Sequence, residues 1–230
     1  KPVTINLREP DGRELVRRLS ADADVLIENF RPGKMEEWGL GPEDLETSNP
    51  RLIYARISGY GQSGPYASRA GFASACEAIG GLRHITGFPG ETPVRPNLSL
   101  GDSLAGLHAA FGILLALIER NRNEDVPGQT IDVAIYEAVF NMLESVVPEY
   151  TGAGVIREPS GSTITGAVPS NTYLCRDGHY VVIGGNADSI FQRLMRTVGR
   201  PEMAEDPRFA DNTGRVSHRR EIDAAIGLWA

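Results

Sequence analysis

One carboxylate stands where it could act as a nucleophile. Asp102 lies in the segment SLGDS, directly before the strongest helical pattern of the chain. The amides and dipole of a helix N-terminus stabilise an ionised carboxylate, and a carboxylate that attacks an acyl group must be ionised, fixed and unhindered. The alternative is an N-cap, in which Asp102 accepts a hydrogen bond from the first-turn amides. The two roles are compatible, so Asp102 is the first candidate for covalent chemistry.

A second group of candidates follows the apolar run VLI at residues 25–27. Asn29, Phe30 and Arg31 stand between this predicted strand and the breaking pair Pro32-Gly33. Polar and aromatic groups at the carboxyl end of a parallel strand often line a ligand crevice. Asn29 can hydrogen-bond an adenine edge and Phe30 can stack on it, whereas the alternative is a structured turn with no ligand.

A glycine loop follows the next predicted strand. Residues 59–64 read GYGQSG, which matches the dinucleotide pattern G-x-G-x-x-G. That pattern needs a helix directly after it, so that the helix N-terminus meets the pyrophosphate, but here Pro65-Tyr66 follows. The segment therefore favours a flexible loop over a pocket, with Gly59, Tyr60, Gly61 and Gln62 as its candidate residues.

Other residue types give weaker signals. His84 and His108 are candidates for acid–base work, although a lone histidine is more often a surface or core residue. No nucleophile elbow is present, and no Cys, His or carboxylate cluster has metal-ligand spacing, so no metal is expected. Cys76 and Cys175 are far apart in sequence, which favours a reducing compartment.

The elements that must position these residues alternate between strands and helices. Apolar runs predict strands at residues 3–7, 25–27 and 52–57, the latter two buried, and alternation predicts one at 130–135. Helical spacing predicts helices near residues 72–82, 103–120 and 136–149. This order favours an α/β domain with a mostly parallel sheet.

The chain changes character after residue 150. Residues 151–171 are dense in Gly, Ser, Thr and Pro, which predicts a linker or an active-site loop. A strand at 180–183 and a helix at 189–198 follow. We therefore expect a large domain over residues 1–150 and a smaller one over 172–230. Because the chain starts without Met and stops inside a helical pattern, we expect both ends to be incomplete.

Composition limits the partners. Lys and Arg number 23 against 30 Asp and Glu, a formal net charge of −7, which argues against nucleic acid as the main partner. Local cations can still hold an anionic ligand. No unbroken apolar run reaches about 18 residues, so no membrane helix is expected.

Four segments together resemble one known family. They are ADVLIENFRPG at residues 23–33, NPRLIY followed by ISGYGQSGP over 49–65, GDS at 101–103 with its helix, and GQTIDVA at 128–134. Their order and sequence are similar to the class III coenzyme A transferases, the CaiB/BaiF type that includes formyl-CoA transferases. The resemblance covers residues 1–150 strongly and continues more weakly to Trp229.

The resemblance implies a function. The family moves coenzyme A from an acyl-CoA to a free carboxylic acid through an aspartyl anhydride and an aspartyl-CoA thioester. Asp102 matches the catalytic Asp, Asn29 and Phe30 match residues against the CoA nucleotide, and the 59–64 loop would lie near the active site. The family has a Rossmann-like large domain and a smaller α+β domain, no permanently bound cofactor, and two chains interlocked as a homodimer. Cytoplasm is the expected location, with the mitochondrion left open.

Departures from the family pattern leave alternatives. Glu37 stands where some members have a basic residue for the CoA phosphates, and Arg31 and Arg69 are the possible substitutes. Related acyl-CoA racemases use a His where this chain has Phe72, which cannot carry a proton. A racemase or dehydratase, or a non-catalytic CoA-binding fragment, therefore remains as an alternative. Succinyl-CoA with a dicarboxylate or hydroxy-acid acceptor is the expected substrate pair.

Overall fold

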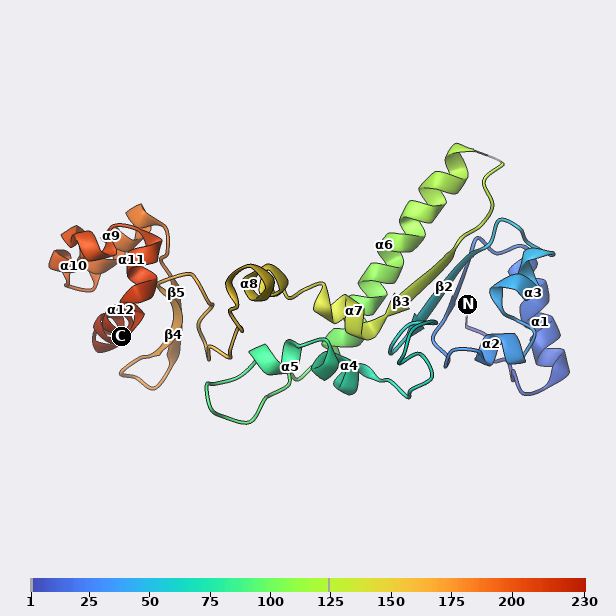
Figure 1. The fold of residues 1–230 in the computed structure, drawn as a ribbon, viewed down its shortest axis with the longest axis horizontal. Coiled ribbons are helices and arrows are strands. Elements are labelled where there is room, and N and C mark those ends of the chain that lie inside the picture. Colours follow the sequence, from blue (N-terminus) through green and yellow to red (C-terminus); the bar gives the residue numbers. More distant parts are fainter. Residues whose placement is uncertain (1, 124) are drawn as a thin grey trace. The chain divides into compact units, whose positions relative to one another are not determined.

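The computed structural model describes residues 2–123 and 125–230 (Figure 1), which belong to two compact units. The first unit runs to His84 and resumes over Arg95–Gly154, and the second holds Ile85–Val94 and Val155–Ala230. The elements that begin in the first unit are α1 (Pro10–Ala21), β1 (Val25–Glu28), α2 (Lys34–Glu37), α3 (Pro42–Glu46), β2 (Ile53–Ser58), α4 (Ala73–Ile79), α5 (Leu82–Ile85), α6 (Leu100–Arg122), β3 (Thr130–Ala134), α7 (Ile135–Phe140) and α8 (Val146–Ala153).

The first unit is built on a parallel sheet in the order β1-β2-β3. Val25 pairs with Ile53, and Tyr54 pairs with Thr130. Because side chains alternate along a strand, Tyr54 packs on one face with the residues of α2 and α3, while Ile53 and Ala55 pack against α6 on the other. Figure 1 shows α1–α3 on one side of the sheet and α6 on the other. The expected α/β fold with a parallel sheet is confirmed.

Small residues allow α6 to lie close to the sheet and to α4 and α7. Its buried residues include Ala105, Ala109 and Ala116, whereas Leu107 and Phe111 on the other face are exposed. Among the described residues, α6 alone is long and apolar enough to cross a membrane, by length and composition only. The expectation of no membrane helix considered only unbroken apolar runs, and it stays a prediction. A single such helix is weak support for a membrane span, because the core helix of a soluble protein meets the same criterion.

Three expectations for the elements of this unit were wrong. Residues 3–7 form no strand in the described part of the chain, because a strand needs a partner for its backbone groups and β1 pairs only with β2. The predicted buried strand at 25–27 forms, but Ile27 is 60% exposed because β1 lies at the sheet edge. The single helix expected over 136–149 is two helices, α7 and α8, with Glu144 between them at a positive φ of 53°.

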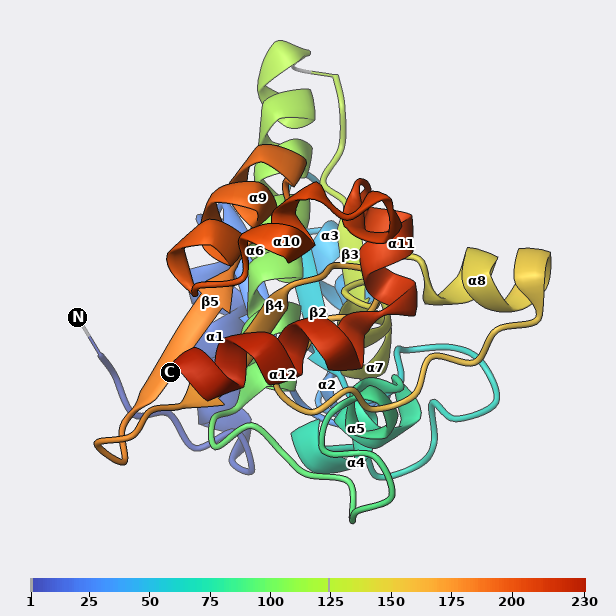
Figure 2. The ribbon, with the colours of Figure 1, turned by 90° about the vertical axis from the view of Figure 1, so that its left-hand side faces the viewer.

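The second unit packs four α-helices and a short 3₁₀ turn on an antiparallel pair of strands. Its elements are β4 (Ser170–Leu174), β5 (Tyr180–Gly184), α9 (Asp188–Thr197), α10 (Pro201–Glu205), the 3₁₀ turn η1 (Pro207–Phe209), α11 (Asn212–Ser217) and α12 (Arg219–Trp229). Figure 2 shows the helices gathered on one side of the pair. Tyr173 faces this core with Phe191 and Ile226, whereas Tyr180 and Val182 are exposed.

Candidate active site

Three parallel strands end at the same edge of the sheet, and a cavity of about 340 Å³ lies there. The segments after β1 and β2, the first residue after β3 and the first turn of α6 all reach it. This convergence is the usual position of a ligand crevice in a parallel sheet. The lining residues are Asn29, Phe30, Arg31, Pro32, Ile57, Ser58, Gly59, Tyr60, Ala67, Arg69, Gly71, Phe72, Asp102 and Ile135.

Asp102 supplies the carboxylate of the cavity. It is the third residue of α6, and Ser99 takes the N-cap position, so the N-cap interpretation of Asp102 was wrong. Its side chain is exposed. Among residues 2–123 and 125–230, no group forms a hydrogen bond or an ion pair with this carboxylate. The helix dipole still favours a negative charge in the first turn. Asp102 is therefore an accessible anion whose oxygens are not engaged by a neighbouring cation.

Glu28 holds the segment that carries Asn29 and Phe30. Its side chain is only 2% exposed, its Oε1 lies 2.8 Å from Nε of Arg56, and its Oε2 accepts a hydrogen bond of 2.7 Å from the Phe30 amide. Arg56 also pairs with Glu36. Burial acts to lower the pKa of Arg56, but the hydrogen bonds to Glu36 and Glu28 outweigh it and raise this pKa. One sequence signal points to this ion pair, because Arg56 interrupts the apolar strand IYARIS and a buried charge needs a partner.

The glycine loop after β2 divides into a lining part and a supporting part. Gly59 and Tyr60 line the cavity, whereas Gly61 and Gln62 do not. A Cβ on Gly59 would lie 2.6 Å from Cα of Gly71, so two backbones meet there without side chains. Gly61 has a positive φ of 82°, which favours glycine, and the next amide, of Gln62, donates to Oδ2 of Asp132 at 2.8 Å. No helix opens after this loop, because α4 starts only at Ala73.

A cation stacked on an aromatic ring stands at the same cavity. The Arg69 guanidinium lies 4.2 Å from the centroid of the Tyr66 ring, and that ring lies 5.6 Å edge-on from Tyr60. Stacking of this kind holds a long side chain in place. Burial raises the pKa of the Tyr60 hydroxyl, and the neighbouring Cys76 thiol adds to this effect. Tyr60 is therefore neutral at physiological pH and can donate a hydrogen bond.

A second cavity, of about 560 Å³, shares Phe30 and Arg31 with the first. Phe30 meets Trp38 edge-on with centroids 5.1 Å apart, and Nζ of Lys34 lies 4.9 Å from the Trp38 ring. Apolar rings next to several cations suit a ligand with a flat base and phosphates. Sequence reasoning missed most of this cavity, whose lining is Ile5, Asn6, Leu7, Arg8, Phe30, Arg31, Lys34 and Trp38.

Several sequence candidates lie elsewhere. Of the described residues that line the Asp102 cavity, none is a histidine. His108 instead contacts Leu104 O at 2.8 Å and Asn141 at 3.1 Å, and His84 lies outside the lining. Phe72 does line the cavity, at the position where a racemase would need a proton carrier. Within the described part of the chain, no group of His, Cys, Asp or Glu could hold a metal ion.

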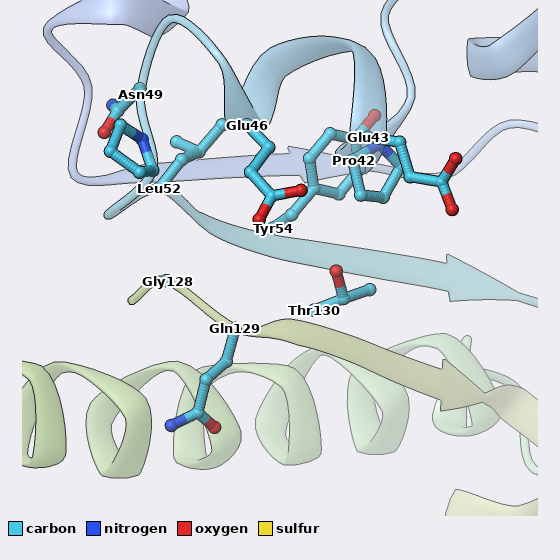
Figure 3. Close-up of a pocket in the computed structure, with 10 residues that line it drawn as sticks. Pro42, Glu43, Glu46, Asn49, Leu52, Tyr54, Gly128, Gln129 and Thr130 are labelled. Atoms are coloured by element: carbon cyan, nitrogen blue, oxygen red, sulfur yellow. The ribbon is translucent and has the colours of Figure 1, made fainter. Parts of the chain in front are cut away.

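The opposite edge of the sheet carries another cavity, of about 210 Å³ (Figure 3). Figure 3 shows Glu43 and Glu46 above β2, Gln129 just before β3 and Thr130 at the start of β3. The only charged groups in its described lining are carboxylates. Such a lining repels anions, so a phosphate-bearing ligand fits the Asp102 edge and not this one.

Comparison with known proteins gives one consistent result. A family model described as CoA-transferase family III matches residues 1–230. The chain is 51% identical over 229 residues to a succinyl-CoA–D-citramalate CoA-transferase of Chloroflexus aurantiacus, covering 100% of this chain and 56% of that protein. It is 32% identical to the human succinyl-CoA:glutarate CoA-transferase, covering 96% of this chain and 50% of that protein.

Solved structures agree with these relatives. A CaiB/BaiF family protein from Brucella suis matches with a TM-score of 0.81 and 37% identity, over 98% of this chain and 59% of that one. The chain thus spans a little more than half the length of the proteins that it matches. From the match of the family model along its whole length, this chain belongs to CoA-transferase family III.

Proposed function

We propose that the protein transfers coenzyme A from an acyl-CoA to a free carboxylic acid, with Asp102 as the nucleophile. The observation that carries this proposal is the exposed, unpaired carboxylate of Asp102 in a cavity at the carboxyl edge of the sheet. A nucleophilic carboxylate needs free oxygens and a route for the substrate, and Asp102 has both. Membership of CoA-transferase family III supports the same chemistry.

The two adjoining cavities suit the two ends of an acyl-CoA. The thioester would lie in the Asp102 cavity, with Asn29 and the Phe30–Arg31 pair at its border. The nucleotide end would lie in the second cavity, where Phe30 and Trp38 offer aromatic surface. Cations that could bind the phosphates line this path, although the net charge of the chain is negative. They are Arg8, Arg31 and Lys34, of which Lys34 also pairs with Glu37.

The reaction balances without an added oxidant, reductant or cofactor. An oxygen of Asp102 attacks the thioester carbonyl, the carbon–sulfur bond breaks, and CoA leaves as a thiolate, so that a mixed anhydride of Asp102 and the donor acid remains. The thiolate attacks the Asp102 carbonyl carbon and releases the donor as a carboxylate. The acceptor carboxylate then attacks the aspartyl-CoA thioester, and the thiolate that leaves attacks the acceptor carbonyl of the new anhydride. Asp102 returns as a carboxylate, and each intermediate keeps an activated acyl bond.

We propose succinyl-CoA as the donor and a dicarboxylic or hydroxy acid as the acceptor. The relatives named above use succinyl-CoA with D-citramalate or glutarate, according to their names. Arg69 supports this choice, since its guanidinium borders the cavity and is steadied by Tyr66. A planar guanidinium binds a carboxylate through two parallel hydrogen bonds. The interlocked homodimer and the cytoplasmic location stay predictions.

The test is covalent capture on the full-length protein. The protein is incubated with succinyl-CoA and other acyl-CoAs, treated with hydroxylamine, and weighed by intact mass spectrometry. We expect a hydroxylamine-sensitive adduct in the wild type and none in Asp102→Asn, with turnover reduced by at least about 10³-fold. Asp11→Asn is the matched control, because Asp11 is also an exposed aspartate in the first turn of a helix.

Two outcomes would contradict the proposal. An adduct of equal yield in Asp102→Asn would place the nucleophile elsewhere. A wild type that binds CoA but forms no adduct with any donor would favour proton-transfer chemistry or a binding role.

A further inference from the structure

A second carboxylate lies buried directly behind the first turn of α6. Glu77, on α4, is 0% exposed. Its Oε1 accepts a hydrogen bond of 3.2 Å from the amide of Gly101, the residue before Asp102. The amides of a helical first turn have no partner inside the helix, and the Ser99 N-cap supplies no side-chain bond. Glu77 therefore acts as a capping side chain for α6, although it belongs to another helix.

Two arginines balance the charge of Glu77. Nε of Arg95 lies 3.1 Å from its Oε2, and Nε of Arg83 lies 3.5 Å from the same oxygen. Arg83 is in turn held by Ser74, whose Oγ accepts a 2.9 Å hydrogen bond. Loss of the arginines would leave the buried charge of Glu77 uncompensated, so the protein favours the geometry in which these ion pairs are formed. Arg83 and Arg95, whose side chains are 22% and 37% exposed, are thus engaged by Glu77 and do not line the Asp102 cavity.

The packing around Gly101 leaves little freedom. A Cβ on Gly101 would lie 3.2 Å from Cγ of Glu77 and 3.2 Å from Cγ2 of Ile135. The backbone next to Asp102 is therefore clamped between α4 and the first residue of α7. Glu77 itself is absent from the described lining of the cavity, so it reaches the substrate only through α6.

We propose that Glu77 is a positioning residue that fixes Asp102 for attack on the thioester. This inference rests on the proposed function. Glu77 holds the Gly101 amide, Arg83 and Arg95 hold Glu77, and the carboxylate of Asp102 is thereby aimed by the backbone alone. Its oxygens stay free for the acyl carbon, because the groups that fix its place do not touch them. Misplacement of a reacting group by about 1 Å can cost on the order of 10²-fold in rate.

The test compares two substitutions at one position in the full-length protein. Glu77→Gln keeps an oxygen that can accept from Gly101, whereas Glu77→Leu keeps the size and removes the acceptor. We expect Glu77→Leu to lower kcat by about 10–100-fold with KM for the acyl-CoA changed less than about twofold, and Glu77→Gln to restore most of kcat. Glu119→Gln, at an exposed glutamate near the other end of α6, should leave both constants unchanged.

A purely structural role would give a different pattern. In that case both Glu77 variants would lose active enzyme in proportion to unfolded protein, and the rate of adduct formation per folded molecule would equal that of the wild type. That result, measured by single-turnover capture with hydroxylamine, would overturn the inference. It is distinct from failure of the proposed function, in which the wild type itself forms no adduct on Asp102.

Discussion

The buried pair between Glu28 and Arg56 allows a sharp test of how the ligand segment is held. Arg56 binds two glutamates that differ in burial, since the Glu28 side chain is 2% exposed and the Glu36 side chain is 44% exposed. Only Glu28 also accepts the Phe30 amide. Substituting each glutamate by Ala therefore distinguishes the effect of losing an ion pair to Arg56 from the effect of also losing the hydrogen bond to the Phe30 amide.

The structure sets different magnitudes for the two changes. Loss of one partner from a buried ion pair costs about 3–5 kcal/mol. Glu28→Ala should fall near or somewhat below the lower end of that range, at about 2–4 kcal/mol of unfolding free energy, because Arg56 keeps Glu36. Glu36→Ala removes an exposed partner, and exposed pairs contribute about 0–1 kcal/mol. The two changes should thus differ although both partners contact one guanidinium.

The assays are urea unfolding and calorimetric titration with coenzyme A, both on the full-length protein. Glu28→Ala should weaken CoA binding about tenfold, the equivalent of one lost hydrogen bond that orders Phe30. Glu36→Ala should leave the affinity within about twofold, because the Phe30 amide stays bound to Glu28. Equal losses of stability, or an unchanged CoA affinity in Glu28→Ala, would refute the reasoning.

Three further predictions follow from local geometry. The hydrogen bond from Arg56 lowers the pKa of Glu36 below 4.5, so its stabilisation is complete above that pH and is lost as the pH falls through the lowered pKa. Acid unfolding below about pH 4.5 should therefore show a smaller pH slope for Glu36→Gln than for the wild type. Burial raises the pKa of the Cys76 thiol, with the charges of Asp102 and Glu77 adding to it. Iodoacetamide at about pH 8 should therefore label the half-buried Cys175 first, and peptide mapping that finds Cys76 labelled first would contradict this. Gly59→Ala must displace the Gly71 backbone and should cost about 1–3 kcal/mol, while Gly106→Ala, with open space around it, should be neutral or stabilising by up to about 1 kcal/mol in the same urea assay.

Local patterns predicted much of the first unit because they depend on neighbours in sequence. The buried run at 52–57 became β2, and the apolar spacing near 103–120 became α6. The segment at 3–7 looked like a strand because of its β-branched residues, but strand formation depends on a partner that composition does not reveal. The helix expected over 136–149 breaks at Glu144, where no Gly or Pro marked the turn.

In the site, the residues that follow the strands could be predicted from the sequence, whereas their contacts with residues far along the chain could not. Asn29, Phe30, Arg31, Gly59, Tyr60, Arg69 and Asp102 meet at one cavity, as residues that follow parallel strands should. The groups that hold them escaped prediction, since Glu28 contacts Arg56 and Glu77 contacts Arg95 across 28 and 18 positions. Arg56 inside an apolar strand was the one sequence signal of such a partner.

Two carboxylates next to one helix terminus have opposite environments, and this difference explains how one of them can react. Glu77 is buried, accepts a backbone amide and meets two guanidinium groups. A carboxylate held in this way is a poor nucleophile, because it is buried away from the cavity and two guanidinium groups balance its negative charge. Asp102 has the helix dipole but no cation on its oxygens among the described residues. The hydrogen bond and ion pairs that fix this helix terminus are thus made by Glu77 and the backbone, and the Asp102 oxygens remain available to the acyl carbon. Exchanging the two roles would leave the cavity with an engaged carboxylate and the interior with an unpaired charge, and neither is compatible with a stable enzyme that attacks a thioester.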